Sequence, residues 1–313
     1  MSPTILVVGS TGNTGQGVTE TLSQELSSTA FAQYRVIALT RSSKSSVAQK
    51  LSKLDHIEMV EKDWTMIDAD WLKEHDVERI FIASHNGVSH FTDESLFLTN
   101  ALEAGVKYVV RISTTRANVG PNTPVFYGRN HWAVEAMLST PEFAELAWTS
   151  LQPNVFTAYT IPGCIAWAKT FKETGKQEPL KLMSDENAAV AVVEGSEVGI
   201  IAAKLLMQEN TAPHNSKKYV VVGPEDVTGR GLVERVEKYA GVKVENVIFR
   251  DRSWLDYATD TPKNVLHSLG LAPRTGWRGE TSLKASPTSP EILELYAPKK
   301  SPYEALERGL ANL

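Results

Sequence analysis

A glycine-rich segment with the sequence GSTGNTG occupies residues 9–15. The apolar run 5–8 before it is typical of a strand buried on both faces of a parallel sheet. After it, Val18, Leu22 and Leu26 are spaced by four and indicate one face of a helix. A GxxGxxG turn between a strand and a helix favours dinucleotide binding. The first glycine permits the turn, the second lets a pyrophosphate approach the backbone, and the third lets the helix sit close to the strand.

The amides at the start of the helix would then face the phosphates of the nucleotide. The alternative is a glycine-rich turn that binds no ligand. The motif does not favour a P-loop, because no Lys-Ser/Thr pair follows the glycines. The residues predicted to contact the phosphates are Gly9, Thr11, Gly12, Asn13, Thr14 and Gly15.

Strand-like and helix-like segments alternate along the rest of the chain. This order predicts an α/β fold with a doubly wound parallel sheet. We expect a nucleotide-binding domain over 1–155, with a later segment near 190–225 returning to the sheet, and a lobe over 156–313 made of helices and long loops in its last part. The predicted strands are 5–8, 34–39, 57–60, 79–83, 108–112, 148–151 and 219–222, and the predicted helices lie near 18–26, 95–104, 127–140, 198–206 and 232–239.

The end of the second predicted strand bears on which dinucleotide binds. NAD-binding folds place an acidic residue there for the ribose 2′-hydroxyl, but no Asp or Glu occurs between residues 26 and 54. Arg41, Ser42 and Lys44 stand there instead, and a guanidinium beside hydroxyl groups suits a 2′-phosphate. The sequence therefore predicts NADP(H) as the cofactor. The alternative is a solvated basic turn.

Composition excludes several other classes of protein. The net charge of −5 leaves no basic excess for a nucleic-acid backbone, so we expect no nucleic-acid partner. No apolar run approaches the roughly 20 residues that cross a bilayer, and the first residues lack the pattern of a signal peptide. The single cysteine, Cys164, fits a reducing compartment and is expected to pack as a small apolar group. We therefore expect a cytoplasmic protein with no membrane partner.

Several segments together resemble the NmrA-like family of the atypical short-chain dehydrogenase/reductase superfamily. They are the glycine segment with Arg41, the pair Asp63-Trp64, and the runs 127–135 (YGRNHWAVE), 151–156 (LQPNVF) and 222–228 (VGPEDVT). The resemblance implies a doubly wound parallel Rossmann sheet with a smaller C-terminal α+β substrate lobe, a ligand cleft between the two, and a preference for NADP(H). It places Asp63 and Trp64 beside the cofactor. Some members of the family are NADPH-dependent reductases, and others bind dinucleotide as redox sensors or co-regulators.

The pair Tyr127-x-x-x-His131 corresponds to the Tyr-x-x-x-Lys of classical short-chain dehydrogenases, in which the lysine holds the ribose and lowers the tyrosine pKa. This sequence departs from the family's common pattern, because histidine stands where lysine is frequent. In one interpretation His131 replaces the lysine as cofactor contact and proton donor, with Tyr127 nearby. In another, the site has lost its chemistry and His131 only packs beside the cofactor. A third places Tyr127 in a loop outside the site.

Other candidates follow the predicted strands, where parallel α/β sheets bind their ligands. Ser113, with Thr114 beside it, follows the fifth strand and either polarises a substrate carbonyl or caps backbone groups. The backbone after the fourth strand is expected to pass the adenine and ribose, and the segment after the sixth strand to lie near the nicotinamide. These two segments contribute Ala83, Ser84 and His85, and Pro153, Asn154 and Phe156.

The aromatic residues after the sixth strand and near the C-terminus indicate a wide apolar pocket, if they face the cleft rather than the lobe core. They are Phe156, Tyr159, Trp167, Phe171, Trp254 and Tyr257. We expect no metal site and no acyl-transfer triad. The sequence thus predicts an NADP(H)-dependent oxidoreductase that reduces a carbonyl or an activated double bond of a hydrophobic, aromatic small molecule. The alternative is a non-catalytic NADP(H) sensor that binds a protein partner.

Overall fold

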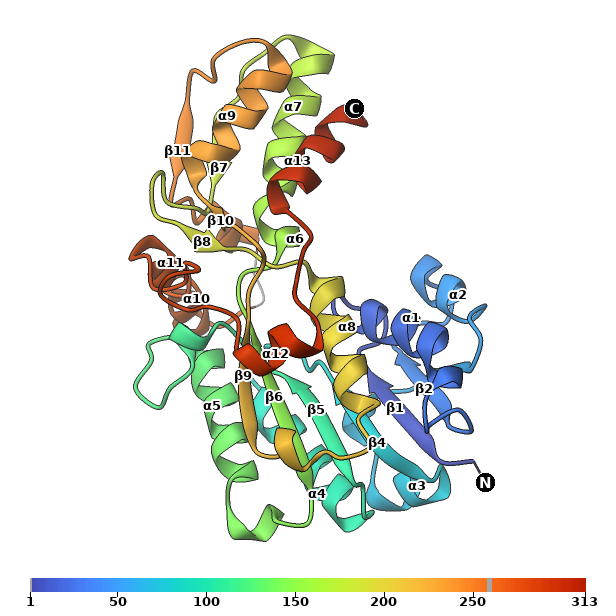
Figure 1. Ribbon diagram of the computed structural model, residues 1–313. Coiled ribbons are helices and arrows are strands. Elements are labelled where there is room, and N and C mark those ends of the chain that lie inside the picture. The colour runs from blue at the N-terminus through green and yellow to red at the C-terminus, as the bar shows by residue number, and fades with distance from the viewer. Residues whose placement is uncertain (1, 258–260) are drawn as a thin grey trace.

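The apolar runs of the sequence pair into one parallel sheet in the computed structural model, which describes residues 2–257 and 261–313 (Figure 1). The sheet has seven strands in the order β3-β2-β1-β4-β5-β6-β9, and all neighbours run parallel. The strand order reverses between β1 and β4, the place where such sheets bind ligands. The strands are β1 (Thr4–Val8), β2 (Arg35–Thr40), β3 (Ile57–Glu61), β4 (Val77–Ile82), β5 (Tyr108–Ile112), β6 (Ala147–Pro153) and β9 (Lys217–Val221).

Helices cover both faces of the sheet because the side chains of its strands alternate between two apolar clusters. Ile5 and Val7 pack against one face's helices, α1 (Gly15–Glu25) and α8 (Gly195–Leu206). Leu6 and Val8 pack on the opposite face, with side chains of α3, α4 and α5. These helices are α3 (Ala69–Glu74), α4 (His90–Glu103) and α5 (Phe126–Leu138), and the short α2 (Ser46–Leu51) follows β2. The predicted doubly wound Rossmann sheet is confirmed.

A smaller lobe lies beyond the carboxyl ends of the strands, at the top of Figure 1. Its own apolar cluster includes Cys164 and Trp167, and it holds two small sheets in which β11 pairs parallel with β7 and β10 antiparallel with β8. The lobe strands are β7 (Leu180–Leu182), β8 (Val190–Ala191), β10 (Asp226–Val227) and β11 (Val247–Phe249). The remaining helices are α6 (Thr157–Thr160), α7 (Pro162–Thr174), α9 (Gly229–Ala240), α10 (Lys263–Leu269), α11 (Arg274–Trp277), α12 (Pro290–Leu295) and α13 (Pro302–Ala311).

Short 3-10 helices interrupt several connections. They are η1 (Leu26–Ser28), η2 (Trp64–Met66), η3 (Arg116–Asn118), η4 (Pro141–Phe143), η5 (Ala212–His214) and η6 (Ser253–Tyr257). None of the helices within residues 2–257 and 261–313 has the length and apolarity that a bilayer crossing requires.

The seven strands of the main sheet and its long helices were all predicted from the sequence. The last part of the chain does form helices and loops, but it also contributes β11, which the sequence did not indicate. Both α8 and β9 belong to the main sheet's layers although they follow the first lobe segment. The division of the chain near residue 155 stays a prediction.

Candidate functional site

The turn after β1 is shaped for close approach to its backbone. Gly9 has φ +82°, and a Cβ there would lie 2.9 Å from the Ala83 carbonyl oxygen. Gly12 donates its amide to the Gly9 carbonyl at 3.0 Å. The Thr14 hydroxyl caps no amide of α1 among the described residues, so the first amides of that helix remain available to an anion. The turn therefore fits the pyrophosphate of a dinucleotide.

Ser10 is a residue of this turn whose role the sequence analysis missed. Its side chain is fully buried, and its hydroxyl donates to the Leu39 carbonyl oxygen of β2 at 2.7 Å. The sequence signal that could have indicated this role is a small hydroxyl residue inside a glycine-rich turn. The contact fixes the glycine turn against the strand whose end carries Arg41.

Arg41, Ser42 and Lys44 follow β2 and are exposed. Within the described part of the chain, the Arg41 guanidinium forms no ion pair with a carboxylate, which leaves it available to a phosphate. The turn itself is held by Glu61 at the end of β3, another residue that was missed. The Glu61 carboxylate accepts from the Ser43 hydroxyl and amide at 2.6 and 2.8 Å, and these bonds lower its pKa.

Asp63 and Trp64 follow β3, next to this turn. The Asp63 carboxylate accepts from the Thr65 amide at 3.0 Å and so caps η2. The Trp64 ring lies edge-on to Phe97 and 6.1 Å from the ring of His85, measured between centroids. Trp64 and His85 thus place flat surfaces at the ends of β3 and β4, and the backbone after β4 is where the sequence analysis expects the adenine and ribose.

A cavity of about 750 Å³ lies at the carboxyl ends of β4, β5 and β6, beneath the lobe. It brings together ten of the predicted site residues. The others, Gly9, Thr11, Gly12, Gly15, Arg41, Ser42, Lys44, Asp63, Trp64 and His85, do not line it and follow β1 to β4 along the same edge of the sheet. The ten in the lining are Asn13, Thr14, Ala83, Ser84, Ser113, Tyr127, His131, Pro153, Asn154 and Phe156.

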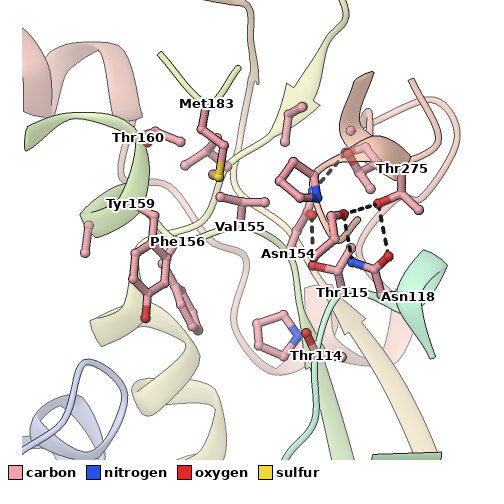
Figure 2. A pocket seen from close by; sticks show the side chains of 18 of the residues that line it. Thr114, Thr115, Asn118, Asn154, Val155, Phe156, Tyr159, Thr160, Met183 and Thr275 are labelled. Carbon is pink, nitrogen blue, oxygen red and sulfur yellow. Dashed lines mark hydrogen bonds between the residues drawn. The ribbon is translucent and has the colours of Figure 1, made fainter. Parts of the chain in front are cut away.

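The cavity has two chemically different sides (Figure 2). Phe156, Tyr159 and Met183 lie on one side in that view, and Trp254 and Trp277 add aromatic lining. The opposite side carries hydroxyl and amide groups, from Thr115, Asn118, Asn154 and Thr275. In the part of the chain that the structure describes, Lys181 and Asp251 are the charged side chains of the lining.

Two of the predicted aromatic residues lie elsewhere. Trp167 and Phe171 stack on each other at 5.4 Å between ring centroids and belong to the lobe core, so they do not line the cavity. The side chain of Tyr257 lies outside the described residues. Cys164 is also buried in the lobe core, and burial raises the pKa of its thiol to about 12.

Asn154 connects the polar side of the cavity to the lobe. Its Nδ2 donates to the carbonyl oxygens of Ala191 and Thr281, at 2.9 and 2.8 Å. Both amide hydrogens are therefore used within the protein, and Oδ1 accepts from Thr115 at 3.4 Å. Two other hydroxyls in this lining, Ser113 Oγ and Thr281 Oγ1, are buried and have no partner among the described residues.

His131 lies in α5, and only 2% of it is exposed. Its Nδ1 is 2.9 Å from Arg111 Nη2, and its Nε2 is 3.0 Å from Oδ1 of Asn86 in the cavity lining. Burial, together with the charge of Arg111, holds the pKa of His131 well below its usual value. Tyr127 is in α5 as well, not in a loop, with its ring centroid 6.4 Å from that of His131. Burial raises the pKa of Tyr127 to about 12.

Arg111 belongs to a group of buried polar side chains between the sheet and helices α4 and α5, which the sequence analysis did not identify. We call it the buried network. The sequence signal that could have indicated this network is an arginine inside an otherwise apolar strand, since charged residues are rarely buried without a partner. The members are the half-buried Ser84 and the buried His90, Glu94, Arg111, His131, Glu135, Ser150 and Gln152.

Three members of the buried network, His90, Glu94 and His131, bring possible metal-ligand atoms within 4.8 Å of one another. However, Arg111 already donates to Glu94 Oε1 at 2.6 Å and to His131. Burial alone would raise the pKa of Glu94, but the charge of Arg111 and the hydrogen bond from His90 outweigh it and lower that pKa. A guanidinium bonded at this point makes the group an ion-pair network rather than a site for a second cation.

Fold and site together define a Rossmann-type protein whose second lobe closes a cavity over the carboxyl ends of the strands. The sequence profile of the NmrA-like family matches residues 1–272, and the chain belongs to this family. The resemblance stated from the sequence motifs is therefore confirmed. A search of the curated proteins finds no significant match.

Solved structures with the same fold include several reductases. One is an NADPH-dependent quinone oxidoreductase from Escherichia coli in complex with NADPH, with TM-score 0.69, 18% identity, and coverage of 97% of this chain and 99% of that one. A triphenylmethane reductase from Citrobacter sp. complexed with NADP(H) has TM-score 0.69, 18% identity, and coverage of 98% and 99%. A mutant of NmrA has TM-score 0.68, 13% identity, and coverage of 100% and 97%.

Proposed function

We propose that the chain is an NADPH-dependent reductase of uncharged, flat, aromatic molecules that carry a carbonyl group or an activated double bond. The observation that carries this proposal is that the glycine turn and the candidate catalytic side chains line the same cavity. The cavity is lined by Asn13 and Thr14 of the glycine turn and also by Ser113, Tyr127 and His131. A nucleotide on the turn and a substrate in the cavity would therefore meet at three polar side chains.

The preference for NADPH over NADH rests on the end of β2. Arg41 is exposed there without a carboxylate partner among the described residues, and a carboxylate at this place would repel a 2′-phosphate. The turn at residues 9–15 would hold the pyrophosphate. The similar quinone oxidoreductase and triphenylmethane reductase were crystallised with NADPH and NADP(H), which supports the same choice here.

When bound, the nicotinamide supplies the hydride of the reaction. The protein would stabilise the negative charge that develops on the substrate oxygen. Ser113 Oγ is buried and unpartnered among the described residues, so its hydroxyl is available to donate to that oxygen. Tyr127 keeps its proton at neutral pH, because burial raises its pKa to about 12, and it is the second available donor.

The proton affinities of Tyr127 and His131 narrow the substrate class. Neither the Tyr127 phenol nor the neutral His131 ring releases a proton readily, so the site stabilises charge by hydrogen bonding better than it transfers protons. A quinone or an enone yields a delocalised anion that needs no strong acid, whereas an isolated ketone yields an alkoxide. We infer that quinones and enones react faster than aryl ketones.

The lining supports a flat, uncharged substrate. Phe156, Tyr159, Trp254 and Trp277 supply aromatic surface, and the facing side supplies hydroxyl and amide groups for ring substituents. Such a cavity favours an aromatic molecule with oxygen substituents over a sugar or an amino acid.

Two measurements test the proposal. Thermal unfolding with NADP, NADPH, NAD and NADH should show the largest stabilisation with NADP and NADPH, which carry the 2′-phosphate. The expected gain in the free energy of unfolding is about 2.7 kcal/mol at 100 times the Kd. NADPH consumption is then followed over quinones, enones and aryl ketones, with Ser113→Ala as the impaired variant. Stabilisation by NADPH without turnover of any compound would favour the second candidate function, a non-catalytic NADPH sensor. The observation that favours this candidate is the histidine at position 131, where the Tyr-x-x-x-Lys pattern has a lysine. Absence of stabilisation by every nucleotide would contradict both.

A further inference from the structure

Arg111 lies in the middle of the sheet, directly behind His131. It is fully buried on β5 and shares the face of Val109, which packs against α4 and α5. We propose that Arg111, held by Glu94, is a positioning residue that fixes His131 as a neutral ring with its proton on Nε2, so that the ring presents a permanent N–H donor to the cavity. The use of that donor by a bound nucleotide or substrate rests on the proposed function, but the state of the ring does not.

The first step is the chemistry of the contact. A guanidinium has only donors, so the atom that faces Arg111 Nη2 at 2.9 Å must supply a lone pair. His131 Nδ1 therefore carries no proton. In a neutral imidazole the proton then resides on Nε2, whichever way the amide of Asn86 is oriented.

The second step is that Arg111 cannot turn away. Its Nε donates to Glu94 Oε1 at 2.6 Å, and its Nη1 donates to Ser150 Oγ at 3.0 Å. Glu94 is itself fixed by Ser84 and His90, which bond its other oxygen at 2.7 and 2.6 Å. The planar guanidinium is thus bound on three sides, and its third side is His131.

The third step concerns the direction of the donor. His131 Nε2 points to Oδ1 of Asn86 at 3.0 Å, and Asn86 is an exposed residue of the cavity lining. An exposed amide can give way to a ligand more easily than a buried one. A ribose hydroxyl or a carbonyl oxygen could then accept from Nε2, because both have lone pairs.

The charges around the ring show that the Arg111–His131 pair offers the cavity a neutral donor rather than a positive charge. Its charge is balanced by Glu94 and by Glu135, whose Oε1 lies 3.7 Å from Arg111 Nη1. On α4, His90 lies edge-on to His131 at 4.4 Å, and on α5 Tyr127 lies 6.4 Å away, measured between ring centroids. The Arg111–His131 pair thus differs from a lysine, which would bring donor and charge together.

The test is nitrogen-15 NMR of the histidine rings in the full chain without nucleotide, with the His131 signals assigned by their loss in His131→Asn. We expect a pyridine-type shift for Nδ1 and a pyrrole-type shift for Nε2, unchanged from about pH 5.5 to 8.5. A protonated Nδ1, or a ring that titrates in this range, would overturn the proposal. The tautomer and the titration are read from the unmodified protein, and His131→Asn serves only to assign the signals.

Arg111→Met tests the cause. Without the guanidinium, the Glu94 carboxylate is left beside the His131 ring. His131 in this variant should therefore take up a second proton and titrate near neutral pH. Ser150→Ala is the matched control, because it removes a different partner of Arg111 and should leave the His131 signals unchanged. If the His131 signals in Arg111→Met equal those of the unmodified protein, Arg111 does not fix the ring.

Nucleotide binding separates this inference from the proposed function. His131→Asn keeps an acceptor where Nδ1 stands but loses the donor toward the cavity, and we expect NADPH to bind about 3- to 10-fold more weakly. His131→Gln can return a donor near the Nε2 position and should recover part of the affinity. Unchanged affinity and turnover in His131→Asn, with the expected ring spectrum, would refute the use of His131 in the proposed function while Arg111 remains its positioning residue.

Discussion

A methyl group on Gly15 would lie 2.0 Å from the carbonyl oxygen of Gly9. The first residue of α1 is thus in direct contact with the turn after β1, and neither backbone can move away without shifting the helix or the strand. We predict that Gly15→Ala lowers the free energy of unfolding by about 1–3 kcal/mol and weakens NADPH binding. Thermal and denaturant unfolding, with and without NADPH, measure both effects.

Gly12→Ala is the matched control for this change. Its Cβ would lie 3.3 Å from the same Gly9 oxygen, and Gly12 is exposed. This variant should keep most of its stability and lose NADPH affinity, because the backbone there would approach the pyrophosphate. Equal unfolding temperatures for Gly15→Ala and the unmodified chain would show that the contact is not tight in solution.

Arg41 is predicted to distinguish NADPH from NADH. Arg41→Ala should weaken NADPH binding about 10- to 100-fold, the value of charge-assisted hydrogen bonds to a phosphate, and leave NADH binding nearly unchanged. Calorimetric titration with both nucleotides measures the ratio. Lys53→Ala removes an equal charge from an exposed position after α2 and serves as control. A similar loss for both variants would indicate a general electrostatic effect instead of a phosphate contact.

His131 should make stability depend on pH. Burial and Arg111 lower its pKa in the folded protein, so below about pH 6.5 the unfolded chain binds a proton that the folded ring does not. Stability is therefore expected to fall as the pH falls from 6.5 toward the folded pKa, by up to about 1.4 kcal/mol per pH unit. Denaturant unfolding between pH 5 and 7.5 should show a smaller slope in His131→Asn. Identical slopes would mean that the folded ring titrates normally.

Ser113 is predicted to act on substrate and not on stability. Its hydroxyl has no partner among the described residues, so Ser113→Ala should leave the free energy of unfolding within about 1 kcal/mol of its value. The loss of a donor to the developing oxyanion should lower kcat/KM on the order of 100-fold. The exposed Ser139→Ala at the end of α5 is the control for a lost hydroxyl. Unchanged kcat/KM in Ser113→Ala would remove Ser113 from the reaction.

The main sheet could be predicted because its central strands are buried on both faces and therefore consist of apolar runs. Segment 5–8 shows this clearly, since it is a short apolar run that ends at a glycine turn, and segment 108–112 interrupts the pattern only with Arg111. The lobe strands β8 and β10 have two residues each, too few for any periodicity to appear. They form because the chain returns to the same place from distant positions, which spacing along the sequence does not record.

The candidate site also has one part that the sequence predicts and one part that it does not. The glycine turn and Arg41 are local patterns whose chemistry follows from neighbouring residues. The contact between Arg111 and His131 joins a strand to a helix 20 positions later, and Glu94 reaches it from a third element. A buried arginine in an apolar strand shows that a partner is needed, but only the folded chain shows which one. The resemblance supplied Tyr127 and His131 without the side chains that control them.

Asn154 has a consequence for how molecules enter the cavity. Both hydrogens of its amide are used to join the end of β6 to Ala191 and Thr281. Movement of these lobe segments away from β6 would break both hydrogen bonds together. We therefore expect the Asn154 side of the cavity to stay closed. Tyr159 on the facing side is 64% exposed. We therefore expect a substrate to enter the cavity past the Tyr159 ring, on its aromatic side, rather than past Asn154.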